Sequence, residues 1–203
     1  MNNNRTLEEA KIDLELLDAC GQGDIEQIQY LLTSPDLLIN ASIHDLSRMG
    51  SEAPIVACEN DKIDTLKYLY FSPTLKYHAC FNVFNNKKQN LPTVAFFESK
   101  SETIIELLTN NQFKNKFDLT HLDIDNLNIL QHASLHNEID IAKILILELN
   151  MNCDKYTRDW LQGNNPQNQS YVEILELIEK RDLYQKIDAD LNISKIPSMK
   201  MKI

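Results

Sequence analysis

The chain has 203 residues, a hydrophobic content of 43% and a formal net charge of −10 at pH 7. These values predict one soluble globular domain with a continuous core, and no apolar run approaches the roughly 18–20 residues that span a bilayer. The acidic balance argues against nucleic acid as the main ligand, because a nucleic-acid site needs a basic surface. The N-terminus lacks the apolar stretch of a secretory signal, so we expect a cytoplasmic protein.

The first predicted element is a helix that begins at a capping box. Thr6 and Glu9 form the Thr-x-x-Glu pattern, in which each side chain accepts a backbone hydrogen bond from the other residue. We expect this helix to run through Leu17. Its polar outer face is what a terminal repeat unit requires.

The most informative feature is an internal repeat. Residues 19–37 return as residues 57–75, with eight of the nineteen positions identical. The same 38-residue spacing separates two further sets of core-type residues: Ala19, Ala57, Ala95 and Ala133, and Leu31, Leu69, Leu107 and Leu145. A unit of this length cannot bury its apolar face alone and must stack on its neighbours.

Each unit is predicted to be a pair of short helices, which makes the fold all-α, a short helical-repeat solenoid. The units lie near residues 12–35, 53–73, 91–111 and 128–149, with a degenerate fifth at 156–181 and a capping helix to about 190. We expect one domain over 1–192 and a disordered tail over 193–203.

The reversal between the two helices of a unit is predicted at Gly23, Asp61, Ser99 and Asn137. Gly, Asp and Asn tolerate the left-handed backbone that such a reversal needs, whereas Ser99 fits it less well.

The helix pair of the first unit resembles the ankyrin repeat, whose pattern is L-x-x-A-A-x-x-G-H-x-E-x-V-x-x-L-L. The matching residues are Leu16, Ala19, Cys20, Gly23, Asp24, Glu26, Ile28, Leu31 and Leu32, and the segment 125–146 resembles the pattern again. Pro54 and Pro92 lie near the Thr-Pro of that family. The units are longer than the usual length of about 33 residues and the Gly-x-Thr-Pro-Leu-His loop is not intact, so another helical solenoid remains an alternative.

The resemblance implies a non-catalytic module for protein–protein interaction. The chain contains 21 Asn, 21 Ile and 16 Lys but only 4 Arg, which fits an AT-rich genome. Similar ankyrin-repeat proteins of intracellular bacteria are often delivered into a host cell. We therefore expect a microbial effector, monomeric, that engages or regulates a protein partner.

The loops between the units are the predicted partner-binding surface. The segment 74–90 carries three lysines, three aromatic residues and no acidic residue, and the next loop adds further lysines and phenylalanines. Aromatic anchors ringed by polar groups dominate protein interfaces. The predicted binding residues are Lys76, Tyr77, Phe81, Phe84, Lys87, Lys88, Phe113 and Lys114. The alternative is that the aromatic side chains fold back over the helices and seal the core.

No catalytic residue, metal-ligand set or cofactor is predicted. Four cysteines without a CxxC pair do not indicate a zinc site, and Cys20 and Cys58 are expected to be small buried residues in a reducing compartment. A metal-binding or hydrolytic enzyme that uses His121, His132, His136 and nearby carboxylates is the alternative function. His132 and His136 would share a helix face, but no third ligand follows at a metal-site spacing.

Overall fold

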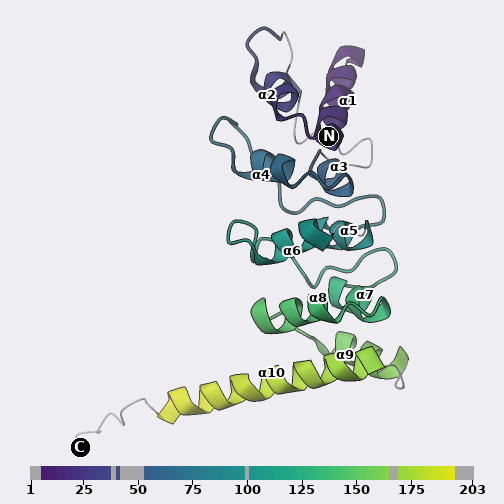
Figure 1. Ribbon diagram of the computed structural model, residues 1–203, viewed down its shortest axis with the longest axis vertical. Helices are drawn as coiled ribbons and strands as arrows, with labels where there is room; N and C mark the ends of the chain where they lie inside the picture. The colour runs from purple at the N-terminus through teal and green to yellow at the C-terminus, as the bar shows by residue number, and fades with distance from the viewer. Residues whose placement is uncertain (1–5, 38–39, 42–52, 99–100, 165–168, 195–203) are drawn as a thin grey trace, which may run out of the picture. The chain divides into compact units, whose positions relative to one another are not determined.

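A computed structural model describes residues 6–37, 40–41, 53–98, 101–164 and 169–194 (Figure 1). All regular secondary structure in these ranges is helical, which confirms the all-α class. None of the described helices is long and apolar enough to cross a membrane. The chain divides into two compact parts, an N-terminal part over residues 1–129 and a C-terminal part over residues 130–203.

The N-terminal part contains three pairs of helices. The pairs are α1 (Leu7–Gln22) with α2 (Ile25–Thr33), α3 (Ala53–Glu59) with α4 (Ile63–Phe71), and α5 (Leu91–Phe97) with α6 (Ser101–Thr109). The first helix of each pair also packs on the first helix of the next pair, α1 on α3 and α3 on α5 (Figure 1). Three of the predicted helix pairs are therefore present and stacked in sequence order.

The reversals within the pairs have the predicted left-handed backbone. The φ angles are 81° at Gly23, 59° at Asp61 and 63° at Asn137, whereas Ser99 lies outside the described residues. At each of these turns the carbonyl of the repeat alanine accepts a backbone N–H from five residues later, at 3.0, 2.8 and 2.8 Å. This bond satisfies a carbonyl that the end of the helix leaves without a partner.

The repeated apolar positions form the core. The alanines and leucines at the 38-residue spacing are all buried, and Ala57, Ala95 and Ala133 are completely enclosed. A small side chain lets the first helices of stacked pairs approach closely, which explains why alanine recurs.

The helix starts also follow the sequence. Thr6 and Glu9 make the reciprocal capping-box bonds of α1, at 3.2 and 2.7 Å. Pro54 and Pro92 are each the second residue of a helix, where the missing N–H costs no intrahelical bond. α1 continues without a break to Gln22, so the predicted cap and the first helix of the first unit are one element.

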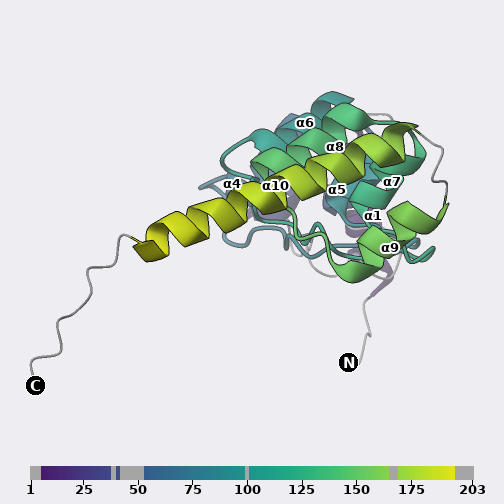
Figure 2. The same cartoon turned by 90° about the horizontal axis from the view of Figure 1, so that it is seen from below.

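The C-terminal part is built around its last helix, α10 (Gln169–Ser194). α7 (Ile129–Leu135) begins at the boundary of the two parts, and α8 (Ile139–Lys143) continues into a π-helical turn, η2 (Ile144–Glu148). α9 (Lys155–Asn164) and α10 form the fifth pair, and α10 also contacts α8 and η2 (Figure 2). The predicted second helix of the fifth unit and the predicted capping helix are one helix of 26 residues. It includes the first two residues of the predicted tail, and residues 195–203 lie outside the described chain.

Candidate functional site

Two loops of the N-terminal part are built alike at equivalent positions of the repeat. Asn85 Oδ1 accepts hydrogen bonds from the backbone N–H groups two and four residues later, at 2.9 and 3.0 Å. Asp123 Oδ1 does the same, at 2.9 and 3.1 Å. The third residue after each, Lys88 and Asn126, has a positive φ of 57° and 59°. A side-chain oxygen therefore fixes the backbone of both loops.

Contacts between these loops hold them side by side. The N–H of Ile124 donates to the carbonyl of Lys87 at 2.9 Å, and His121 Nε2 lies 2.8 Å from the carbonyl oxygen of Lys88. The Phe84 ring stacks on the His121 ring with 4.3 Å between centroids. We call residues 84–90 together with 118–127 the loop pair.

Asn90 connects the loop pair to the helices. Its Oδ1 accepts from the N–H of Thr93 at 3.2 Å and so caps α5. Its Nδ2 donates to the carbonyl of Asp118 at 2.7 Å. One buried side chain therefore begins the helix and fastens the second loop.

The loop pair presents a mixed apolar and charged surface. Phe84, Leu122 and Ile124 are 38%, 38% and 57% exposed, and Lys87 and Lys88 beside them are exposed as well. The surface also carries two exposed carboxylates, Asp118 and Asp125. It is therefore less basic than the lysines of segment 74–90 alone suggested.

Phe113 is buried, so its predicted contact with a partner is wrong. It has no exposed surface and lies in a cluster with Tyr70 and Phe71, at 5.9 and 5.0 Å between ring centroids. Phe81 is half-buried and stacks on Tyr70 at 4.3 Å. For Phe81 and Phe113, the alternative interpretation that aromatic side chains seal the core is the better one. Burial removes the large apolar surface of an aromatic ring from water.

The remaining predicted residues divide between two places. Lys76 and Tyr77 are exposed just after α4, with the lysine Nζ 5.1 Å from the tyrosine ring centroid. Lys114 is half-buried in the turn after α6, where its N–H donates to the carbonyl of Asn110. Figure 1 shows the connection leaving α4 on one side and reaching α5 on the other. The structure therefore brings only Phe84, Lys87 and Lys88 of the predicted set into the loop pair.

Sequence reasoning missed His121, Leu122 and Ile124 as members of this surface. The 38-residue spacing was an available signal, because it places 122–126 at the same repeat position as 84–88. Segment 118–127 contains acidic residues, so it did not fit the basic and aromatic composition by which the binding loops were predicted.

The three histidines of the alternative enzyme prediction lie in different places in the described part of the chain. His121 belongs to the loop pair, His132 is buried on α7, and His136 is exposed in the turn that follows that helix. The described part of the chain contains no group of three His, Cys, Asp or Glu side chains placed to hold a metal ion. His78 Nε2 lies 2.8 Å from the carbonyl oxygen of Ser72, to which it is hydrogen-bonded.

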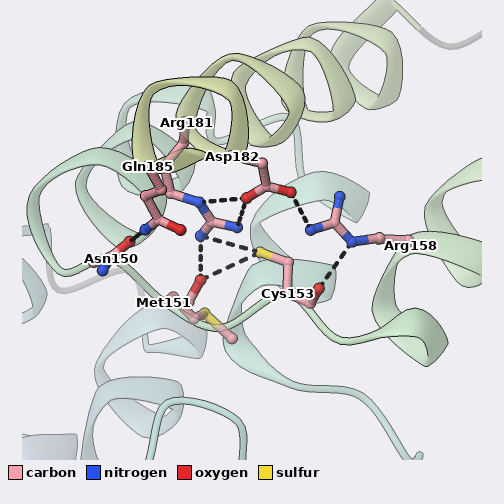
Figure 3. A network of polar contacts seen from close by, with 7 residues as sticks. All are labelled: Asn150, Met151, Cys153, Arg158, Arg181, Asp182 and Gln185. Atoms are coloured by element: carbon pink, nitrogen blue, oxygen red, sulfur yellow. Dashed lines mark hydrogen bonds and ion pairs between the residues drawn. The ribbon is translucent and has the colours of Figure 1, made fainter. Parts of the chain in front are cut away.

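A second polar cluster lies in the C-terminal part, where two arginines hold one carboxylate (Figure 3). Arg158 Nη2 is 2.5 Å from Asp182 Oδ2, and Arg181 Nη2 is 2.7 Å from Asp182 Oδ1. Arg181 also donates to the carbonyl of Met151, and Arg158 Nε donates to that of Cys153 at 2.9 Å. We call these residues the clasp, because they tie α10 to α9 and to the segment before it.

The clasp borders an open polar hollow of about 220 Å³. Partial burial raises the pKa of Asp182, but the hydrogen bonds from Arg181 and Arg158 outweigh it and hold the pKa below its ordinary value of 3.8. Because both guanidinium groups already have partners inside the chain, we interpret the clasp as structural.

A scan against protein-family models gives no match, and a search of the curated proteins gives none either. The loop pair is therefore interpreted from its own geometry.

Proposed function

We propose that the chain is an ankyrin-like helical-repeat protein that acts as a non-catalytic protein–protein interaction module and binds its partner through the loop pair. The observation that carries this proposal is the rigid presentation of Phe84, Leu122 and Ile124 beside Lys87 and Lys88. Exposed aromatic and aliphatic side chains with a charged rim have the composition of a protein interface.

The rigidity of the loop pair favours binding. Association costs free energy whenever a loop must be ordered. Here the backbone is already fixed by Asn85 and Asp123 within the loops and by the bond between Ile124 and Lys87 across them. A partner that meets this surface therefore orders mainly side chains.

Three features support the ankyrin-like repeat. The helix pairs of the N-terminal part stack in order, the turns at Gly23 and Asp61 share one backbone conformation, and the loops at Asn85 and Asp123 repeat one hydrogen-bond pattern. Each feature recurs at the 38-residue spacing. That spacing is what a chain assembled from stacked copies of one unit requires.

The proposed setting is a microbial effector that acts on a protein of a host cell. The Asn-, Ile- and Lys-rich and Arg-poor composition supports it. The mixed charge of the loop pair favours a partner surface with an apolar centre and both signs of charge around it.

A capture experiment with a matched control tests the proposal. The loop variant carries Phe84→Ser, Lys87→Glu and Ile124→Ser. The control variant carries Tyr30→Ser, Lys116→Glu and Ile105→Ser, three exposed residues of the same kinds elsewhere in the N-terminal part.

Both variants should keep the circular dichroism of the wild type and stay within a few degrees of its melting temperature, because the hydrogen bonds that fix the loop pair do not involve the six replaced side chains. Proteins captured from a eukaryotic lysate would then be quantified by mass spectrometry. A partner retained by the wild type and the control but lost by the loop variant supports the proposal. A partner retained by the loop variant contradicts it.

A further inference from the structure

The second half of α10 carries an exposed apolar stripe. Leu183, Tyr184, Ile187 and Leu191 are 57%, 58%, 44% and 53% exposed. Spacings of three and four residues place them along one face of the helix. Figure 2 shows this half of α10 continuing past α8 and α9 of the C-terminal part.

The first half of the same helix explains why the stripe stays exposed. Tyr171, Ile174 and Ile178 are buried against the neighbouring helices. The clasp then fixes α10 at Arg181 and Asp182, immediately before the stripe begins. At 100° per residue Ile187 lies about 180° around the helix from Ile178, so the stripe is on the face of α10 opposite the packed one.

The charges beside the stripe indicate what could cover it. At 100° per residue, Lys186 and Asp190 lie on one flank of the stripe and Asp188 lies on the other, all three exposed. An anionic lipid surface would need a cationic rim, which these two carboxylates and one lysine do not supply. Opposite charges on a single flank instead suit a second copy of the same helix.

We propose that α10 docks antiparallel on α10 of a second copy of this chain, with the two-fold axis near Ile187. Residues equally far before and after the axis then face each other, so Leu183 meets Leu191 of the second copy. Equivalent flanks also face each other, which places Lys186 near Asp190 of the second copy and Tyr184 near its Asp188. Such a self-complementary contact is the isologous interface of a symmetric dimer.

A parallel pairing is disfavoured by the same residues. In a parallel two-fold pair opposite flanks face each other, so the carboxylate of Asp190 would lie near that of Asp188 of the second copy. The sequence predicted a monomer, and the dimer proposed here is weak. Four side chains on about two and a half turns of helix cover less than the roughly 800 Å² per partner of a standard interface, so we expect a dissociation constant of roughly tens to hundreds of micromolar.

Sedimentation velocity of the full chain from about 5 to 500 μM tests the association. The wild type should shift toward the dimer as its concentration rises. Leu183→Glu should remain monomeric, whereas the control Leu147→Glu, a leucine 50% exposed on η2, should behave as the wild type. A wild type that stays monomeric at the highest concentration, or a Leu183→Glu variant that still dimerises, overturns the proposal.

A cysteine trap tests the antiparallel register. In a Cys80→Ser background, which removes the exposed thiol, Leu183→Cys and Leu191→Cys proteins would be oxidised separately and as a mixture. We expect the mixed disulfide to form at least tenfold faster than either symmetric one. Faster symmetric disulfides would contradict the antiparallel pairing.

Discussion

Of two threonines at equivalent repeat positions, one has a hydrogen-bonded hydroxyl and the other does not. The same substitution is therefore predicted to change the stability of the fold in opposite directions at the two positions. Thr65 and Thr103 are related by the 38-residue spacing, and both are about 1% exposed. The Thr103 hydroxyl donates to the carboxylate of Asp61, the residue at the turn of the preceding unit. For Thr65, the turn residue of the preceding unit is Gly23, which has no side chain to accept a hydrogen bond. Among the described residues the Thr65 hydroxyl has no partner.

Thr→Val keeps the shape of the side chain and removes the hydroxyl. At Thr103 it deletes a hydrogen bond to a charged acceptor, a type worth about 1.5–3 kcal/mol. Asp61 is exposed and regains water, so we expect a net loss of about 1–2 kcal/mol. At Thr65 the substitution removes an unsatisfied buried group that costs about 1–3 kcal/mol, so we expect a gain of about 1 kcal/mol.

Thermal unfolding followed by circular dichroism separates the two variants. At about 2–4 °C per kcal/mol for a chain of this size, Thr65→Val should raise the melting temperature and Thr103→Val should lower it. Equal destabilisation by both substitutions would refute the reasoning, because it would mean that the Thr65 hydroxyl is satisfied.

A third variant, Gly23→Asn, supplies the missing acceptor. Asn tolerates a positive φ such as the 81° at Gly23. Its Cβ would lie 3.0 Å from Cδ of Lys62, a flexible side chain that can move away. In a double-mutant cycle, Gly23→Asn should be more favourable when Thr65 is present than in the Thr65→Val background.

Three further predictions concern the cysteines, the clasp and the loop pair. Burial raises the pKa of the Cys20 thiol to about 12 and also raises that of the Cys58 and Cys153 thiols. A disulfide reagent at pH 8 should therefore react quickly with Cys80 alone in the folded protein, and with all four thiols after unfolding. The pKa of Asp182 is lower in the folded state than its ordinary value of 3.8. Its contribution to the stability of the fold is therefore present above pH 3.8 and is lost as pH falls through the lower folded-state pKa. The urea midpoint of Asp182→Asn should consequently fall less between pH 7 and pH 3 than that of the wild type. Asn90→Asp keeps the cap oxygen of α5 but removes the donor to the second loop, so hydrogen exchange should speed up at residues 118–127 and remain unchanged in α5.

The helix pairs could be predicted from the sequence because the interactions that define them are local. Ala57 and Asp61 lie four residues apart, and a small core residue followed by a left-handed turn is enough to end one helix and begin the next. The same signals occur at Ala19 with Gly23. The repeat therefore indicates where each pair begins and turns, although its stability depends on the neighbouring pairs.

The candidate site could be predicted only in part, because exposure in a loop depends on distant residues. Phe84 and Phe113 have similar neighbours in the sequence, with lysine and asparagine close by. Phe113 is enclosed because Tyr70 and Phe71, which belong to the preceding repeat unit, lie beside it. Phe84 stacks on the ring of His121 and stays 38% exposed. Composition identifies aromatic loops, but the path of the backbone decides which ring reaches solvent.

The stripe on α10 follows from the same physics at a larger scale. A repeat unit buries apolar side chains on its neighbours, and no helix follows α10 among the described residues. The first half of α10 packs on α8 and α9, whereas its second half keeps Leu183, Ile187 and Leu191 exposed at helical spacing. A monomeric capping helix needs a polar outer face. The apolar side chains of this stripe therefore favour a second copy over solvent as the environment for which this half of the helix is built.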